Sequence, residues 1–173
     1  VASAKIYDFI WDTYCDWYIE LTKTRLNGED EQAKLAAENV LCYVLLRILE
    51  LMHPFMPFIT EEIWQALPHE GDFLIKAKWP EYREEFNFAG SENAMEAVKD
   101  AISAVRARRA EMNVPPSKKA QMIIVTEKPE NYEVGKHFIN RMAYGSDVTV
   151  TTAAPADLTG MVTVVTHDAN VYM

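Results

Sequence analysis

Basic side chains are concentrated in one short stretch of an otherwise acidic chain. The 173 residues carry a formal net charge of −9, which argues against a protein that coats nucleic acid through its overall field. Within this chain a cluster of five cations has a single carboxylate, Glu111, among its members. The five are Arg106, Arg108, Arg109, Lys118 and Lys119. Because the elbow Pro115-Pro116 separates the arginines from the lysines, the cations lie on two elements around a bend, an arrangement that suits a phosphate backbone. Ordinary surface charge is the alternative.

Aromatic residues form a second group that could take part in binding. Trp11, Tyr14, Trp17 and Tyr18 recur at helical spacing near the start of the chain. Most of these rings are expected in the core of a helical bundle. One ring at an exposed groove would instead be able to stack on an unpaired base, which is worth about 1–3 kcal/mol.

Residue patterns typical of catalysis are missing from the sequence. There is no P-loop, no G-x-G-x-x-G, no H-E-x-x-H and no G-x-S-x-G. The four histidines are far apart, and none lies near a cysteine. Cys15 and Cys42 form no C-x-x-C pair and are typical of reduced thiols in a cytosolic protein. The sequence therefore predicts no catalytic residue and no metal site.

The elements that must position these residues are mainly helices. Apolar periodicity predicts helices over 4–26, 31–52, 57–67 and 91–112, with an extended segment and an acidic connector at 73–90. We expect Trp11, Ile48, Phe55, Phe58 and Trp64 to be buried, the two Phe rings filling the bundle around the HPFMPF bend. No apolar run approaches the ~18 residues of a membrane span, so no membrane is expected among the partners.

After Pro116 the period of the apolar pattern changes. Strands are predicted over 122–125, 148–150, 161–165 and 169–172, and a helix over 131–144. The predicted fold is a mainly α chain, with a helical bundle over 1–112 followed by a small mixed α/β subdomain over 117–173. Because the chain stops inside a strand-like run, we expect this subdomain to be truncated.

Three motifs carry a resemblance to a known family. They are Phe9–Asp12 followed by Cys15–Glu20, then His53–Trp64, and finally Arg109–Lys119. Together they resemble the anticodon-binding domain of valyl-tRNA synthetases, which are class I aminoacyl-tRNA synthetases. The HPFMPF stretch is shared with the isoleucyl and leucyl enzymes, whereas Arg109–Lys119 is closer to valyl enzymes.

The resemblance implies a bundle of the class Ia anticodon-binding type and a tRNA partner, expected to be specific for valine. It also implies a parent enzyme that uses ATP with Mg to activate valine. The catalytic and editing domains of that enzyme would lie upstream in the same chain, so this part alone is expected to hold no cofactor and to be inactive.

The candidate tRNA-binding residues follow from the same resemblance. In related methionyl enzymes a Trp near the matching part of the bundle stacks on an anticodon base, which makes Trp17 the best-placed ring here. Arg106 and Arg109 match basic positions of the valyl pattern, whereas Arg108 stands where an aliphatic residue is usual. Lys118 and Lys119 complete the candidates.

Two alternatives remain open from the residues alone. One is the same region of an isoleucyl or leucyl synthetase. The other is a helical protein–protein interaction module in which the basic cluster is incidental.

Overall fold

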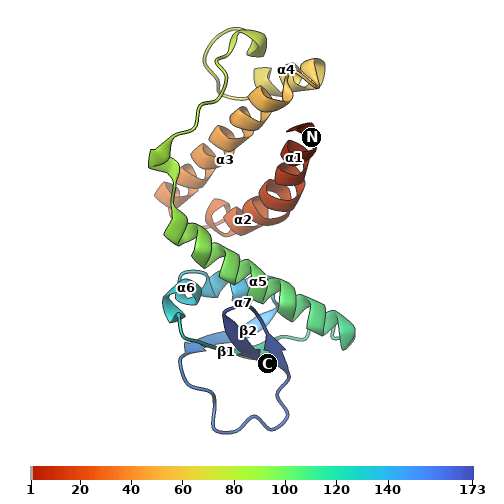
Figure 1. The fold of residues 1–173 in the computed structure, drawn as a ribbon, viewed down its shortest axis with the longest axis vertical. Helices are drawn as coiled ribbons and strands as arrows, with labels where there is room; N and C mark the ends of the chain where they lie inside the picture. The colour runs from red at the N-terminus through yellow and green to blue at the C-terminus, as the bar shows by residue number, and fades with distance from the viewer. Residues whose placement is uncertain (1) are drawn as a thin grey trace. The chain divides into compact units, whose positions relative to one another are not determined.

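A computed structural model describes residues 2–173, which form two compact units. The first unit ends at Arg83, and the second spans Glu84–Met173. Figure 1 labels the elements of both units along the chain. No helix among residues 2–173 combines the length and the apolar character needed to cross a membrane.

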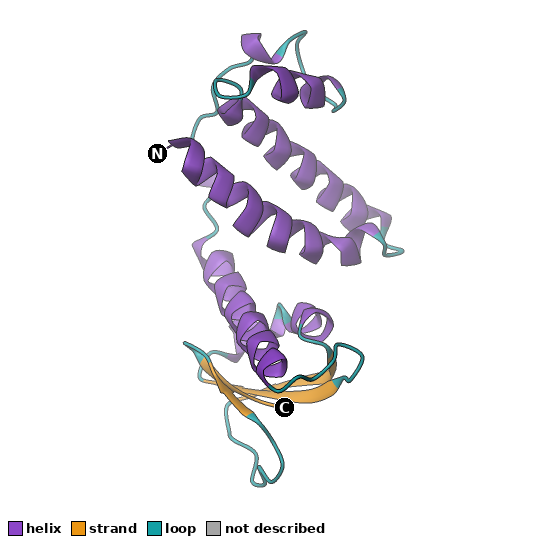
Figure 2. Cartoon of the chain, turned by 90° about the vertical axis from the view of Figure 1, so that its right-hand side faces the viewer, coloured by secondary structure: helices purple, strands orange, loops and turns teal. Residues whose placement is uncertain are grey.

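The first unit is helical throughout. Three consecutive segments run without a break alongside the long helix α3, as the two ribbon views show (Figures 1 and 2). The Asp30 carboxylate caps α3 by accepting hydrogen bonds from the N–H groups of Gln32 and Ala33 at 3.0 and 3.1 Å. The elements of the unit are α1 Ala2–Asp8, η1 Phe9–Ile19, α2 Glu20–Leu26, α3 Glu31–Met52, α4 Pro57–Gln65 and η2 Leu74–Lys76.

The helix predicted over 4–26 is present, but its centre is a π-helix over Phe9–Ile19. A π-helix has i→i+5 hydrogen bonds, so its side chains do not follow the 3.6-residue period of an α-helix. Tyr14 is buried and donates a hydrogen bond from its hydroxyl to the Leu41 carbonyl at 3.0 Å. Trp11 is 49% exposed, so the expectation that it is buried was wrong.

The core of the first unit lies where α3, α4 and η2 meet. Leu49, Trp64 and Leu74 form its buried cluster, and Ile48 is also buried, which confirms the expectations for Ile48 and Trp64. Pro57 occupies the first turn of α4, as its missing N–H favours.

The two Phe rings of the HPFMPF bend do not fill this core. Phe55 is 51% exposed and Phe58 is 90% exposed, so the expectation that they are buried was wrong. The short helix α4 turns Thr60 and Trp64 inward, one helical turn apart. Phe58 precedes Thr60 by two residues and therefore projects from the opposite side of α4.

The second unit is a layer of helices on a four-stranded sheet. The strand order is β2-β1-β4-β3, with β1 and β2 parallel and the other neighbours antiparallel. Figure 2 shows α5 and the two short helices on one face of this sheet. The elements are η3 Glu84–Phe86, α5 Ala89–Glu111, β1 Ala120–Thr126, α6 Pro129–Glu133, α7 Lys136–Met142, β2 Gly145–Thr151, β3 Thr163–Val165 and β4 Ala169–Tyr172.

Two boundaries differ from the sequence-based expectation. The helix predicted over 131–144 is divided at Gly135, where a Cβ atom would lie 2.3 Å from a methyl group of Val98 on α5. The close approach of α5 therefore requires glycine here. Helix α5, predicted as part of a bundle over 1–112, packs on α6, α7, β3 and β4 and belongs to the second unit.

Candidate nucleic-acid interface

The basic cluster is organised by the C-terminus of α5. Asn113 adopts a left-handed conformation with φ of 52°. Its N–H donates to the Ala110 carbonyl at 3.0 Å, and the Val114 N–H donates to the Arg109 carbonyl at 2.9 Å. This pair of bonds is a Schellman motif, which ends the helix and reverses the direction of the chain. The Pro115-Pro116 elbow follows at once, and the Lys118 N–H closes it by donating to the Pro115 carbonyl at 3.1 Å.

Arg109 stabilises this elbow from within. Its side chain is buried, with only 4% of the residue exposed. The guanidinium donates hydrogen bonds to the Pro115 carbonyl at 3.1 Å and to the Lys118 carbonyl. It also lies 5.7 Å from the ring centroid of Tyr144, within the range of a cation–π contact. Arg109 is therefore directed at the protein's own backbone, and the expectation that it faces a phosphate does not match its position.

The remaining cations of the cluster are exposed. Arg108 pairs with Glu111 at 2.9 Å, so its charge is partly compensated. Arg106, Lys118 and Lys119 are exposed, and their charged groups have no ion-pair partner among residues 2–173. The elbow thus presents two free lysines, and Arg106 adds a third free cation on α5.

A family profile described as the anticodon-binding domain of tRNA ligase matches residues 1–124. The chain belongs to this family.

Relatives of the chain carry one shared name. The chain is 46% identical over 175 residues to the valine–tRNA ligase of Clostridium acetobutylicum, covering all of this chain and 20% of that protein. It is 48% identical over 151 residues to the enzyme of the same name from Halalkalibacterium halodurans, covering 86% of this chain and 17% of the relative. It is 42% identical over 168 residues to the valine–tRNA ligase of Oceanobacillus iheyensis, covering 95% of this chain and 19% of that protein. The chain thus spans about a fifth of the length of these relatives.

As an anticodon-binding domain, the chain has its candidate residues in both units. Trp17 lies in the π-helix of the first unit and is half-buried. Arg106, Lys118 and Lys119 belong to the second unit. The position of Arg109 in the sequence already distinguishes it from these cations. Arg109 lies at helical spacing after Val98, Ile102 and Val105, on the apolar side of α5, and all four side chains are buried.

Metal-ligating residues do not converge in the described part of the chain. Among residues 2–173 no three His, Cys, Asp or Glu side chains lie together in a way that could hold a metal ion. The chemistry available at the elbow is the attraction of exposed cations for an anion.

Proposed function

We propose that this chain is the part of a valine–tRNA ligase that holds the anticodon side of the tRNA. The observation that carries the proposal is the elbow after α5, where Arg109 is buried against two carbonyls and leaves Lys118 and Lys119 exposed. Membership of the anticodon-binding family supports RNA as the ligand, and the names of the relatives support valine as the amino acid.

The role of the elbow is to position the RNA. Lys118, Lys119 and Arg106 contact phosphates, whereas Arg109 holds the backbone in the shape that presents the lysines. Phosphate contacts fix the position of the protein along the RNA and carry no sequence information. Discrimination among tRNAs therefore requires contacts to unpaired bases. Trp17 supplies one such contact by stacking.

The chemistry belongs to the rest of the parent enzyme. That enzyme activates valine with ATP and Mg and transfers it to the tRNA from its upstream domains. Binding energy at the anticodon orients the distant acceptor end for that reaction.

Salt dependence of tRNA binding tests the elbow. We expect a Kd of about 10⁻⁴–10⁻⁶ M that weakens steeply with salt, because each neutralised phosphate releases counterions. Lys118→Ala and Lys119→Ala should each reduce the slope of log K against log salt by about one. Lys128→Ala is the matched control: it removes the same charge beyond the opposite end of β1, where Lys128 pairs with Asp168. Unchanged slopes in both elbow variants, or no tRNA binding at all, would contradict the proposal.

Base preference tests Trp17 separately. Trp17→Ala should change the preference among anticodon stem-loops that differ in one loop base, and should leave the salt slope unchanged, because stacking releases no counterions. An equal loss of affinity for every stem-loop would assign Trp17 to the structure of the unit.

A further inference from the structure

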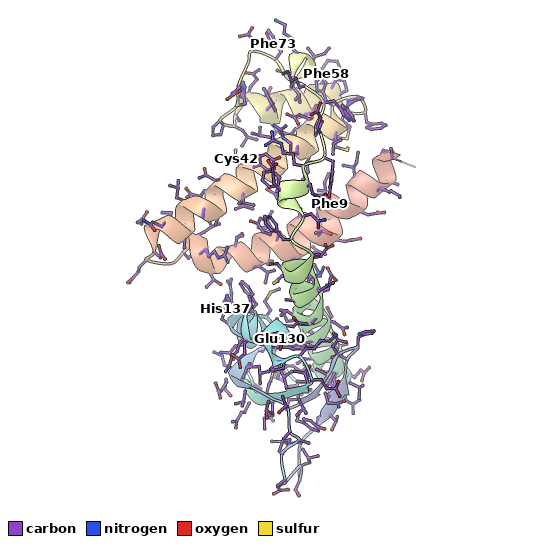
Figure 3. All side chains as sticks on the ribbon, turned by 60° about the vertical axis from the view of Figure 1, so that its left-hand side comes forward. Phe9, Cys42, Phe58, Phe73, Glu130 and His137 are labelled. Carbon is purple, nitrogen blue, oxygen red and sulfur yellow. The ribbon has the colours of Figure 1, made fainter. Side chains whose placement is uncertain are left out.

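A pocket of about 380 Å³ lies in the first unit between the end of α3 and the segment that follows η2. Its volume falls within the ~300–1,000 Å³ typical of small-ligand sites. Figure 3 labels Phe58 on α4 and Phe73 just before η2, at the end of the unit where α4 and the following loop lie. The lining combines apolar, charged and aromatic groups, among them Glu50, His53, Leu74, Lys78 and Trp79.

The outer wall of the pocket is fixed by α4. The Glu61 carboxylate accepts a hydrogen bond from the Leu74 N–H at 3.0 Å and another from the Gln65 side chain at 2.8 Å. The Gln65 amide also donates to the Asp72 carbonyl at 2.6 Å. These bonds hold the segment from Asp72 to Leu74 against α4, so the pocket has a defined wall.

Glu50 supplies a buried acceptor in this pocket. Only 6% of the residue is exposed, and one carboxylate oxygen pairs with Arg47 at 2.9 Å. The other oxygen, Oε2, is buried without a hydrogen-bond partner among residues 2–173. Burial raises the pKa of this carboxyl, and the Arg47 charge opposes that rise. A buried acceptor without a donor is unfavourable, and a ligand that brings a donor would satisfy it.

His53 adds an imidazole ring to the lining of the pocket. Its Nδ1 lies 2.8 Å from the Thr60 hydroxyl, and that hydroxyl donates its proton to a backbone carbonyl of the bend. These contacts anchor the His53 ring to the bend between α3 and α4. The pocket thus offers the Glu50 carboxylate as an acceptor to a ligand that carries an N–H donor.

The rim of the pocket carries an aromatic ring and a positive charge. Trp79 is 60% exposed and offers an aromatic face. Lys78 is exposed, and its ammonium has no ion-pair partner within residues 2–173. A free cation at the rim disfavours a Lys or Arg side chain as the ligand and favours a ligand that joins neutral N–H donors to an anionic group.

We infer that this pocket binds one unpaired nucleotide of the RNA, with its base against Trp79, its exocyclic amino group donating to Glu50, and its phosphate near Lys78. The inference rests on the proposed function and names a further contact within it. Stacking on an indole suits any base, and a carboxylate selects an amino group such as N4 of cytosine over the carbonyl oxygen of uracil.

Titration with CMP and UMP tests the pocket directly. The two nucleotides differ in the group at C4 and share the ribose and phosphate. We expect CMP to shift the indole N–H resonance of Trp79, assigned with Trp79→Phe, at a concentration at least fivefold lower than UMP. Equal shifts by both nucleotides, or no shift by either, would overturn the inference.

Variants of the carboxylate identify the acceptor. Glu50→Gln should bring the CMP-to-UMP ratio to about one, because Arg47 holds the remaining oxygen and the amide NH2, a donor, takes the place of Oε2. Glu62→Gln, at an exposed position on α4, removes the same charge and should leave the ratio unchanged. If Glu50→Gln does not fold, as judged by far-UV circular dichroism, Glu50→Asp retracts the acceptor with the charge kept and should lower the ratio. A ratio that survives a folded Glu50 variant would exclude Glu50 as the acceptor.

Two further outcomes separate this inference from the proposed function. A salt slope that depends on Lys118, together with equal shifts by CMP and UMP, would leave the proposed function standing and overturn the pocket. A CMP preference in a chain that binds no tRNA would support the pocket and contradict the proposed function. N-acetyl-arginine amide is the competing probe: a shift of Trp79 by this cation and not by CMP would assign the pocket to a basic side chain.

Discussion

Large apolar side chains are distributed differently in the two units. The nine largest side chains that are almost fully buried among the described residues, including Ile102, Ile124 and Tyr132, all belong to the second unit. The first unit instead carries fifteen of the twenty-one exposed large apolar side chains, Phe58 and Trp79 among them. A helix layer on a sheet encloses a core between two faces, whereas paired helices bury one stripe each.

This difference shows that apolar content does not measure burial. The first unit has all four Trp of the chain, yet Trp11 is 49% exposed and Trp79 is 60% exposed. The second unit is closer to a self-contained scaffold, and its cations lie where that scaffold ends a helix.

The largest expected effect is in the core of the second unit. Ile102 is completely buried on α5, and Ile102→Ala should lower the free energy of unfolding by about 2–5 kcal/mol, because it removes buried contacts and leaves a cavity. Urea unfolding followed by far-UV circular dichroism measures the change. A loss below 1 kcal/mol would contradict the view of this unit as a closely packed scaffold.

A pH-dependent effect of intermediate size is expected in the first unit. Burial raises the pKa of Tyr14 to about 12, and the neighbouring Cys15, Tyr18 and Cys42 add to the rise. The neutral Tyr14 side chain stabilises the fold fully at pH values below the pKa of about 10 that tyrosine has in the unfolded chain. As the pH rises through about 12 the free energy of unfolding should fall by roughly 2–3 kcal/mol. Tryptophan fluorescence during urea unfolding reports this unit, which contains every Trp. Tyr14→Phe should weaken the decline between pH 9 and 12, and an identical decline in both proteins would exclude Tyr14 as its source.

A smaller effect is expected at the start of α3. Asp30→Ala should lower the free energy of unfolding of the first unit by about 1 kcal/mol, because two backbone N–H groups lose their acceptor. Asp30→Asn keeps an acceptor oxygen and serves as the control. Equal losses in both variants would indicate that charge, and not capping, is the source of the stability.

The smallest effect is expected at the most exposed ring. Phe58→Ala should change the free energy of unfolding by no more than about 0.5 kcal/mol, because the side chain is 90% exposed. Trp64→Ala, at a buried position of the same helix, should cost about 3–5 kcal/mol. If Phe58→Ala were as costly as Trp64→Ala, the contrast between buried and exposed rings in the first unit would fail.

Local patterns determined the fold class and the order of the elements. Apolar periodicity predicted the helices around α3 and α5, and each of the four strands overlaps a predicted one, β1 to β3 through runs of β-branched residues. Prolines shortly after α3 and α5 marked the ends of these helices correctly, because a proline has a fixed φ and no backbone N–H and so cannot continue a helix. The cluster of cations around Pro115-Pro116 was also visible, because it depends on neighbours in the chain.

Contacts between distant segments decided the rest. Arg109 is buried between the Pro115 and Lys118 carbonyls and the ring of Tyr144, 35 residues further along the chain, and Gly135 interrupts a helix because α5 approaches it. Phe58 is exposed because α4 packs on α3 and η2 through the side that carries Thr60 and Trp64, so its outer side stays free. The sequence by itself determined which elements form and which charges gather, since both depend on nearby residues. Which side chains are buried and which remain available to a ligand depends on packing between segments remote in sequence, and only the tertiary structure decided it.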